Sequence, residues 1–251
     1  MNLIFIVGTA GSGKSLLTSA FSDWLKLKKQ DVVVVNLDPG VLNLPYTPDV
    51  DIREYISIDK LMNNYALGPN GALIMAADLI ATEIETIKND IVGFNPDYVL
   101  IDTPGQIELF AFRASGPYII NEISSDPKVM LYLFDSTFSA NPMNYISNVF
   151  LACAVQTRFT IPMLHVLSKI DMIPRREVTK ILAWSTRIGA LEDAVDGLSD
   201  MKRLMSLNLI HLFSRLGISI SLIPVSSTKE TGFANLHGVL MRIFSGGEEI
   251  V

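Results

Sequence analysis

The chain has 251 residues, of which 49% are hydrophobic and only 18% are charged. A net charge of -6 argues against direct binding to nucleic acid or to an anionic membrane, and a single cysteine excludes an internal disulfide or a cysteine-based metal centre. No uncharged apolar run approaches the roughly 20 residues of a membrane span. We therefore expect a cytoplasmic protein without a membrane partner, and the low charge content favours apolar surface covered by another subunit.

The chain opens with an apolar run at residues 3–7, a glycine-rich loop at residues 8–15 and a helix-patterned stretch at residues 16–27. Glycines allow backbone N–H groups to curl around an anion, and the positive end of the following helix points at the same charge. We predict that Lys14 reaches the β and γ phosphates of a nucleotide and that Ser15 binds Mg²⁺. The predicted phosphate-binding residues are Gly11, Ser12, Gly13, Lys14, Ser15 and Leu16.

Short β-branched runs then alternate with longer amphipathic stretches. This alternation predicts an α/β fold of the P-loop NTPase type, a mostly parallel sheet flanked by helices, with its chemistry at the carboxyl ends of the strands. We expect one domain over residues 1–251, with inserts at about 39–70 and 174–216, the second one helical. The expected strands are residues 32–35, 98–101, 129–134, 163–167 and 219–223, and the expected helices are 51–65, 71–91, 141–156 and 201–216.

The turn Asp102-Thr103-Pro104-Gly105-Gln106 follows the strand at residues 98–101. Asp102 is a candidate ligand of Mg²⁺, and the Gly105 N–H is a candidate donor to the γ phosphate, which is absent from the diphosphate. Asp38, after the strand at residues 32–35, is a second acidic residue expected to face the triphosphate and the metal. Both Asp38 and Gln106 are candidates for orienting the attacking water.

Ser168-Lys169-Ile170-Asp171 follows the strand at residues 163–167 and resembles the guanine-reading motif of GTPases, in which Asn or Thr is commoner than Ser at the first position. The Asp171 carboxylate would accept from guanine N1–H and the 2-amino group together. Adenine has neither donor, so ATP would leave Asp171 desolvated and unpaired. Ser226 and Ser227, after the last expected strand, resemble the short motif that contacts the guanine oxygen.

With Gly68-Pro69-Asn70 added, the whole chain resembles a GPN-loop GTPase of the archaeal homodimeric branch. The resemblance implies a Mg²⁺-dependent GTP-hydrolysing switch in which Asn70 enters the site of the partner subunit, and it favours Asp38 over Gln106 as the residue that orients water. It also implies a large client complex such as RNA polymerase. For Asn70 the alternative is a proline turn that caps the helix beginning at Gly71.

Other interpretations fit parts of the sequence. An ATP-driven partitioning or metal-cluster ATPase would need a further lysine where Thr9 stands, and a cluster carrier would need more cysteines. A nucleotide-bound scaffold would have the same motifs, and a small-molecule kinase would not explain Asp171. The apolar residues after Gln106, namely Leu109, Phe110, Phe112 and Tyr118, fit either the core or an interface. We expect structural roles for Cys153, His165, His211 and His237.

Overall fold

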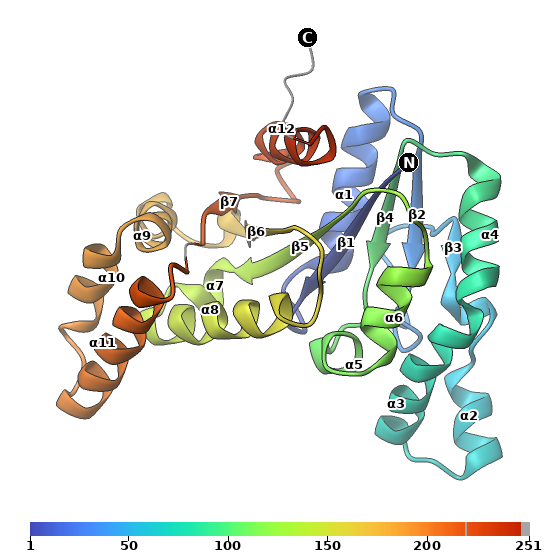
Figure 1. Ribbon diagram of the computed structural model, residues 1–251, viewed down its shortest axis with the longest axis horizontal. Coiled ribbons are helices and arrows are strands. Elements are labelled where there is room, and N and C mark those ends of the chain that lie inside the picture. The colour runs from blue at the N-terminus through green and yellow to red at the C-terminus, as the bar shows by residue number, and fades with distance from the viewer. Residues whose placement is uncertain (219, 247–251) are drawn as a thin grey trace.

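The computed structural model describes residues 1–218 and 220–246 and confirms the expected α/β fold (Figure 1). Its described residues include a seven-stranded sheet in the order β3-β2-β4-β1-β5-β6-β7, in which every neighbouring pair of strands is parallel. The carboxyl ends of the strands therefore meet at one edge. The strands are β1 (Asn2–Gly8), β2 (Val32–Asn36), β3 (Val50–Asp51), β4 (Tyr98–Asp102), β5 (Lys128–Asp135), β6 (Met163–Ser168) and β7 (Leu222–Pro224).

Helices cover both faces of the sheet, which explains why the central strands are continuously apolar. In β1, Phe5 packs into the core on one face and Ile6 into the core on the other, and both are fully buried. The Ile6 face is covered by α1 (Lys14–Leu27) and α12 (Phe233–Phe244). The remaining helices are α2 (Ile58–Tyr65), α3 (Pro69–Leu79), α4 (Ile84–Phe94), α5 (Ile107–Ala111), α6 (Ser115–Glu122), α7 (Ser136–Ser139), α8 (Pro142–Gln156), α9 (Arg175–Thr186), α10 (Ile188–Val195) and α11 (Asp200–Arg215).

Three boundaries differ from the sequence-based expectation. The stretch expected as a helix over residues 51–65 begins instead with the end of strand β3 and a short 3-10 helix, η1 (Ile52–Glu54), so that α2 is only its second half. The helix expected over residues 71–91 is split between α3 and α4 by a second 3-10 helix, η2 (Ile80–Glu83). Strand β7 covers only the end of the run expected at residues 219–223, and Ser219 lies outside the described residues.

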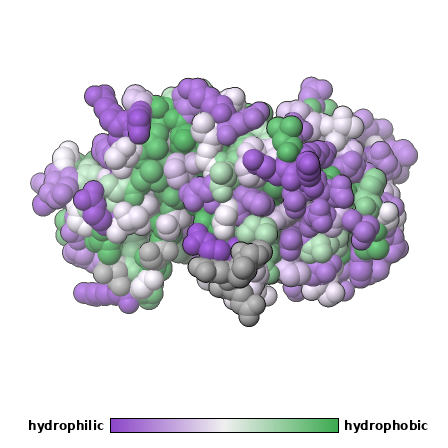
Figure 2. Space-filling model, turned by 90° about the horizontal axis from the view of Figure 1, so that it is seen from above, coloured by the Kyte–Doolittle hydropathy of each residue, from purple (hydrophilic) through white to green (hydrophobic). Residues whose placement is uncertain are grey.

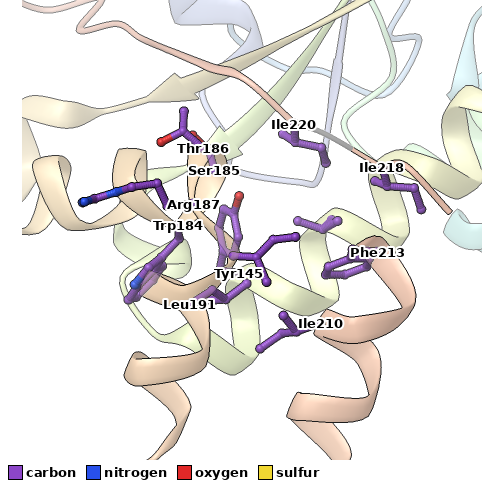
Figure 3. A pocket seen from close by; sticks show the side chains of 12 residues that line it. Tyr145, Trp184, Ser185, Thr186, Arg187, Leu191, Ile210, Phe213, Ile218 and Ile220 are labelled. Carbon is purple, nitrogen blue, oxygen red and sulfur yellow. The ribbon is translucent and has the colours of Figure 1, made fainter. Parts of the chain in front are cut away.

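The expected helical insert is formed by α9, α10 and α11, which pack beside α8 on one side of the sheet (Figure 1). A cavity of about 120 Å³ lies among these helices, with Tyr145, Trp184 and Phe213 in its mostly apolar wall (Figure 3). Seen from above, green apolar patches lie on the half of the surface where the insert is located, interleaved with hydrophilic side chains (Figure 2). The wall of this cavity includes none of the predicted site residues.

The apolar segment after Gln106 serves both the core and the surface. Leu109 and Phe110 in α5 are buried, and the Phe110 ring stacks on that of Phe159. Phe112 and Tyr118, in contrast, are 43% and 48% exposed. Leu109 and Phe110 therefore belong to the core, whereas Phe112 and Tyr118 are accessible to another molecule.

Candidate nucleotide site

The predicted phosphate loop joins β1 to α1 at the carboxyl edge of the sheet. Gly11 and Gly13 have φ angles of +74° and +95°, a backbone conformation that residues with a Cβ atom rarely adopt. The Ser12 N–H donates to the Thr9 carbonyl oxygen at 3.1 Å, which closes the loop. The loop then enters α1 at Lys14, so backbone N–H groups and the positive end of the helix converge on the same space.

The Lys14 ammonium is buried at the centre of this arrangement. It donates to the carbonyl oxygens of Gly8 at 3.0 Å and Thr9 at 3.1 Å, and across the site to that of Gly105 at 3.0 Å. Burial lowers the pKa of Lys14, and the nearby charges of Asp102 and Asp38 oppose this shift. Lys14 thus connects the phosphate loop with the turn that follows β4.

Asp102, the last residue of β4, is 1% exposed. Its Oδ2 atom accepts a hydrogen bond from the Tyr46 hydroxyl at 2.9 Å, whereas its Oδ1 atom is buried without a hydrogen-bond partner in the described part of the chain. Burial raises the pKa of Asp102 to about 6, against the opposing effects of Ser15, Tyr46 and Lys14. A free carboxylate oxygen beside a hydroxyl is an oxygen donor set that suits Mg²⁺, so the residues present fit this ion.

Asp38 bridges the two loops of the site. Its Oδ1 accepts from the Gly40 N–H at 2.9 Å, and its Oδ2 accepts from the Gly105 N–H at 2.7 Å. The donor predicted for the γ phosphate is therefore bonded to a carboxylate within this structure. Gln106, the other candidate for orienting water, is exposed at the start of α5. Asp38 bonds Gly105, and Gln106 is the next residue along the chain, so both remain candidates for orienting the attacking water.

The predicted base-reading residues, except Ser226, line a hollow of about 200 Å³ that also includes Gly13 and Leu16 at the start of α1. Ser168 donates from its hydroxyl to the Ser12 carbonyl oxygen at 2.8 Å, which ties the end of β6 to the phosphate loop. The Lys169 ammonium reaches the Gly11 carbonyl oxygen at 2.5 Å and the Asp135 Oδ2 atom at 2.7 Å. The hollow also contains Asp171 and Ser227.

Both oxygens of the Asp171 carboxylate are held by hydroxyl groups. Ser226 donates to Oδ1 at 2.6 Å and Thr228 donates to Oδ2 at 2.8 Å. These hydrogen bonds, that of Ser226 first, lower the pKa of Asp171, although burial acts in the opposite direction. The carboxylate is thus kept ionised and oriented, with further lone pairs left to accept from a base.

Three residues of this region escape the sequence argument. Asp135 directly follows the run at residues 129–134, so the rule that strand ends carry the chemistry could have identified it. Thr228 directly follows the motif residues Ser226 and Ser227, which is a weaker signal. Tyr46 meets Asp102 across 56 positions of sequence, and nothing in the pattern of the insert indicates that contact.

Asn70 lies at the exposed start of α3, with Gly68 at the N-cap and Pro69 in the first turn. No hydrogen bond among the described residues joins Asn70 to Lys14, Asp38 or Asp102. The start of α3 instead borders, through Pro69 and Leu73, a cavity of about 470 Å³ that residues 39–42 also line. The structure therefore places the tripeptide beside the loop that follows Asp38 and leaves the Asn70 side chain on the surface.

The histidines and the cysteine lie away from the site. Burial lowers the pKa of His165 to about 4, and burial raises the pKa of Cys153. His237 lies 3.2 Å from the Tyr98 hydroxyl, and His211 lies 3.0 Å from a Glu192 carboxylate oxygen. Within the described ranges, no group of three or more His, Cys, Asp or Glu residues could hold a metal ion.

Comparisons with known proteins match almost the whole chain. A family profile described as "Conserved hypothetical ATP binding protein" matches residues 6–245. GPN-loop GTPase 1 of Dictyostelium discoideum is 32% identical over 236 residues, 90% of this chain and 59% of that protein. A GPN-loop GTPase of Pyrococcus abyssi is 29% identical over 94% of both chains. The structure of a GTPase in apo form from Pyrococcus abyssi superposes with a TM-score of 0.84 at 28% identity, covering 96% of each chain.

A parallel sheet with a glycine-rich phosphate loop between β1 and α1 defines a P-loop nucleotide-binding protein. The profile and the named relatives narrow this class, and the chain belongs to the GPN-loop GTPase family. It spans 59% and 63% of the length of the GPN-loop GTPase 1 proteins of Dictyostelium discoideum and Saccharomyces cerevisiae. Among the residues that the structure describes, none of the helices combines the length and apolar character needed to cross a bilayer.

Proposed function

We propose that this chain binds GTP together with Mg²⁺ and hydrolyses it to GDP and phosphate. The observation that carries the choice of base is Asp171, whose carboxylate is held by Ser226 and Thr228 in a hollow that adjoins the phosphate loop. Guanine offers this carboxylate two donors, N1–H and the 2-amino group, whereas adenine offers none there. ATP would bring no donor to these oxygens, so it should bind less tightly than GTP, although Ser226 and Thr228 keep the carboxylate hydrogen-bonded.

In this proposal the chain's own residues bind the triphosphate from three directions. The N–H groups of residues 11–16 and the Lys14 ammonium bind the phosphates, and Lys14 exchanges its carbonyl partners for phosphate oxygens. Ser15 and Asp102, with Asp38 nearby, would hold Mg²⁺, which supplies charge neutralisation of the triphosphate. The Gly105 N–H donates to the γ phosphate in place of the Asp38 carboxylate. Asp38, once released, or Gln106 orients the attacking water.

Further parts of the proposal rest on the family resemblance. We propose that the chain works as one GTPase domain with inserts at about 39–70 and 174–216, and that it acts as a homodimeric switch in the cytoplasm. Asn70 would then act in the nucleotide site of the partner subunit. The client would be a large complex such as RNA polymerase, and neither nucleic acid nor a membrane would be a direct partner.

Calorimetry with GTP, ATP and xanthosine triphosphate tests the choice of base. The unmodified chain should bind GTP far better than ATP. Asp171→Asn replaces an acceptor oxygen with a donor amide, so the preference should move toward xanthosine triphosphate, whose base presents the complementary pattern. Equal affinities of the unmodified chain for GTP and ATP would overturn the proposal.

The phosphate and metal assignments have their own test, which is GTP binding with and without a chelator of Mg²⁺. Lys14→Ala should remove most of the affinity for GTP, because the buried ammonium is the main positive side chain at the phosphates. Ser15→Ala and Asp102→Ala should chiefly weaken the dependence on Mg²⁺. If chelation and all three substitutions left GTP binding unchanged, the nucleotide site would lie elsewhere.

A further inference from the structure

A network of three side chains contacts the backbone of Asp38 and of the residues that follow it. It consists of Asn36 at the end of β2, Asp51 at the end of β3 and Arg53 in η1. Asn36 and Asp51 are neighbours in the register of the parallel pair, so the sheet itself sets their spacing. None of these three residues has a part in the hydrolysis proposed above.

Asn36 fixes the backbone of Asp38. Its Oδ1 atom accepts from the Asp38 N–H at 3.0 Å, and its Nδ2 group donates to the Asp38 carbonyl oxygen at 3.2 Å. The same Nδ2 group donates to Asp51 Oδ1 at 2.9 Å. Asn36 is fully buried, so its amide cannot turn to water instead. The side-chain amide of Asn36 therefore bonds both the N–H and the carbonyl group of Asp38 and fixes the direction of the backbone there.

Arg53 fixes the chain beyond Asp38. Its guanidinium makes a two-pronged contact with the Asp51 carboxylate, with an NH2 to Oδ2 distance of 2.6 Å and Nε at 3.0 Å from each oxygen. Its NH1 group donates to the carbonyl oxygens of Val41 at 3.1 Å and Leu42 at 3.4 Å. The guanidinium spreads its donors over three nitrogen atoms in one plane, so it bonds both Asp51 oxygens on one side and the two carbonyl groups on the other, whereas an ammonium presents its donors from a single atom.

The charges of the network support this geometry. Burial raises the pKa of Asp51, but hydrogen bonds from Arg53 and Asn36 outweigh burial and leave it below its ordinary value. Hydrogen bonding to Asp51 raises the pKa of Arg53, and Asp38 adds to that rise. An ion pair that served only the sheet edge would need no contact with Val41 or Leu42. These two contacts restrain the backbone on the far side of Asp38.

We propose that Arg53, anchored on Asp51, which Asn36 holds in turn, is a positioning residue that aims the Asp38 carboxylate. With the backbone held before and after it, Asp38 reaches the Gly105 N–H and, with GTP bound, the attacking water. This inference rests on the proposed GTP hydrolysis. Loss of the restraint should slow the chemical step, because a displacement of about 1 Å at a reacting group can cost about 100-fold in rate.

The deciding variant is Arg53→Lys, because it keeps a positive charge next to Asp51 and should leave the melting temperature close to that of the unmodified chain. A lysine would replace three donor nitrogens with one, so it cannot reproduce the two-pronged contact with Asp51 while it also reaches Val41 and Leu42. We expect kcat for GTP to fall at least about 10-fold, and about 100-fold in Arg53→Ala, with the affinity for a non-hydrolysable GTP analogue within about 3-fold of the unmodified value. Guanidinium chloride at low millimolar concentration should restore part of kcat to Arg53→Ala.

The matched control is Arg203→Ala, because Arg203 also bonds an aspartate, Asp196, at 2.9 Å but lies in the helical insert. It should leave kcat unchanged. An unchanged kcat in Arg53→Lys, or a loss of analogue affinity as large as the loss of kcat, would overturn the positioning role.

A second readout separates this inference from the proposed function. Amide hydrogen exchange at residues 40–42 should become faster in Arg53→Lys and stay unchanged in Arg203→Ala. If the unmodified chain hydrolysed no GTP, the proposed function would be wrong, and the exchange rates would still decide whether Arg53 holds the loop. Exchange rates equal to those of the unmodified chain would contradict that restraint.

Discussion

The buried carboxylate of Asp102 destabilises the nucleotide-free fold, and the same carboxylate is suited to binding a divalent cation. A carboxylate that is 1% exposed, with one oxygen unpaired among the described residues, is disfavoured in its charged form. Lys14 and the hydroxyl groups of Tyr46 and Ser15 reduce this cost without removing it, since the pKa of Asp102 still lies near 6. A bound divalent cation would reverse the balance, because it stabilises the charged form.

Replacing Asp102 with Asn should therefore stabilise the nucleotide-free protein at neutral pH. Between about pH 4 and pH 6 the folded chain binds more protons at this carboxyl than the unfolded chain, so stability falls as the pH rises. A rise from 3.8 to about 6 corresponds to about 3 kcal/mol once the group is fully ionised. Asp102→Asn should raise the free energy of unfolding by up to that amount at pH 7.5, and the gain should shrink toward zero near pH 4.

Urea unfolding at several pH values, without nucleotide or Mg²⁺, measures this difference. Asp23→Asn is the control, because Asp23 is an exposed aspartate of α1 and its replacement should change stability little at either pH. A variant at position 102 that is less stable than the unmodified chain at pH 7.5 would show that the buried charge does not weaken the fold.

The sequence predicts the residues of the candidate site that directly follow strands, for a physical reason. Lys14, Asp102 and Asp171 come after buried runs, and a parallel sheet gathers the ends of such runs at one edge. Tyr46 lies in a part of the insert without a clear period, and Arg53 lies where the pattern predicts a helix and the structure has η1, so the contacts of both depend on how the insert folds back. A contact across many positions, such as that of Tyr46 with Asp102, leaves no trace in local periodicity.

At the scale of elements, the expected strands agree well with the structure, and the errors lie where local patterns are ambiguous. Strand β3 has only two residues, too few for any alternation to be visible. The break between α3 and α4 at η2 is not predicted from the sequence, because the stretch at residues 71–91 contains no proline and keeps its apolar stripe through the 3-10 turn. Tertiary packing, rather than local propensity, sets these boundaries.

The helices that follow the Asp102 turn are packed closely enough to depend on one glycine. Gly116 in α6 faces the end of α5, where a Cβ atom would lie 1.9 Å from the Phe110 carbonyl oxygen. Gly116→Ala must push α5 and α6 apart, so we expect the free energy of unfolding to fall by about 1 to 3 kcal/mol or more. Thermal or urea unfolding measures the loss.

Gly238→Ala provides the matched comparison. Gly238 lies inside helix α12, and nothing lies within 4 Å of the position that its Cβ would take. Alanine is the better helix former, so this variant should gain about 0.5 to 1 kcal/mol. Similar effects of the two substitutions would mean that the contact between α5 and α6 is looser than the structure indicates.

For the molecule as a whole, the proposed homodimer would explain why Phe112, Tyr118 and Asn70 are exposed on the surface of a single chain. Phe112 and Tyr118, which follow the Asp102 turn, are each more than 40% exposed. Asn70 is exposed at the start of α3, beside the cavity that borders the Asp38 loop. A second subunit that covered the apolar pair could also bring its own Asn70 to the phosphates.

The last prediction is that Asn70 acts across this dimer. Proline at position 69 fixes the turn, so little entropy remains to be lost when the Asn70 amide donates to a phosphate oxygen. Losing one such donor costs about 2.7 to 4 kcal/mol of transition-state stabilisation, or roughly 100-fold to 1000-fold in rate. Asn70→Ala should therefore bind GTP nearly normally and hydrolyse it slowly.

Mixing two inactive variants tests the geometry, because a site that acts in trans needs one intact feature from each subunit. Asn70→Ala and Lys14→Ala chains should each be nearly inactive alone. In a mixed dimer, the intact phosphate loop of the Asn70→Ala chain would face the intact Asn70 of the Lys14→Ala chain, so one working site should return. If mass measurement confirmed mixed dimers and no activity returned, Asn70 would act in its own subunit or merely cap α3.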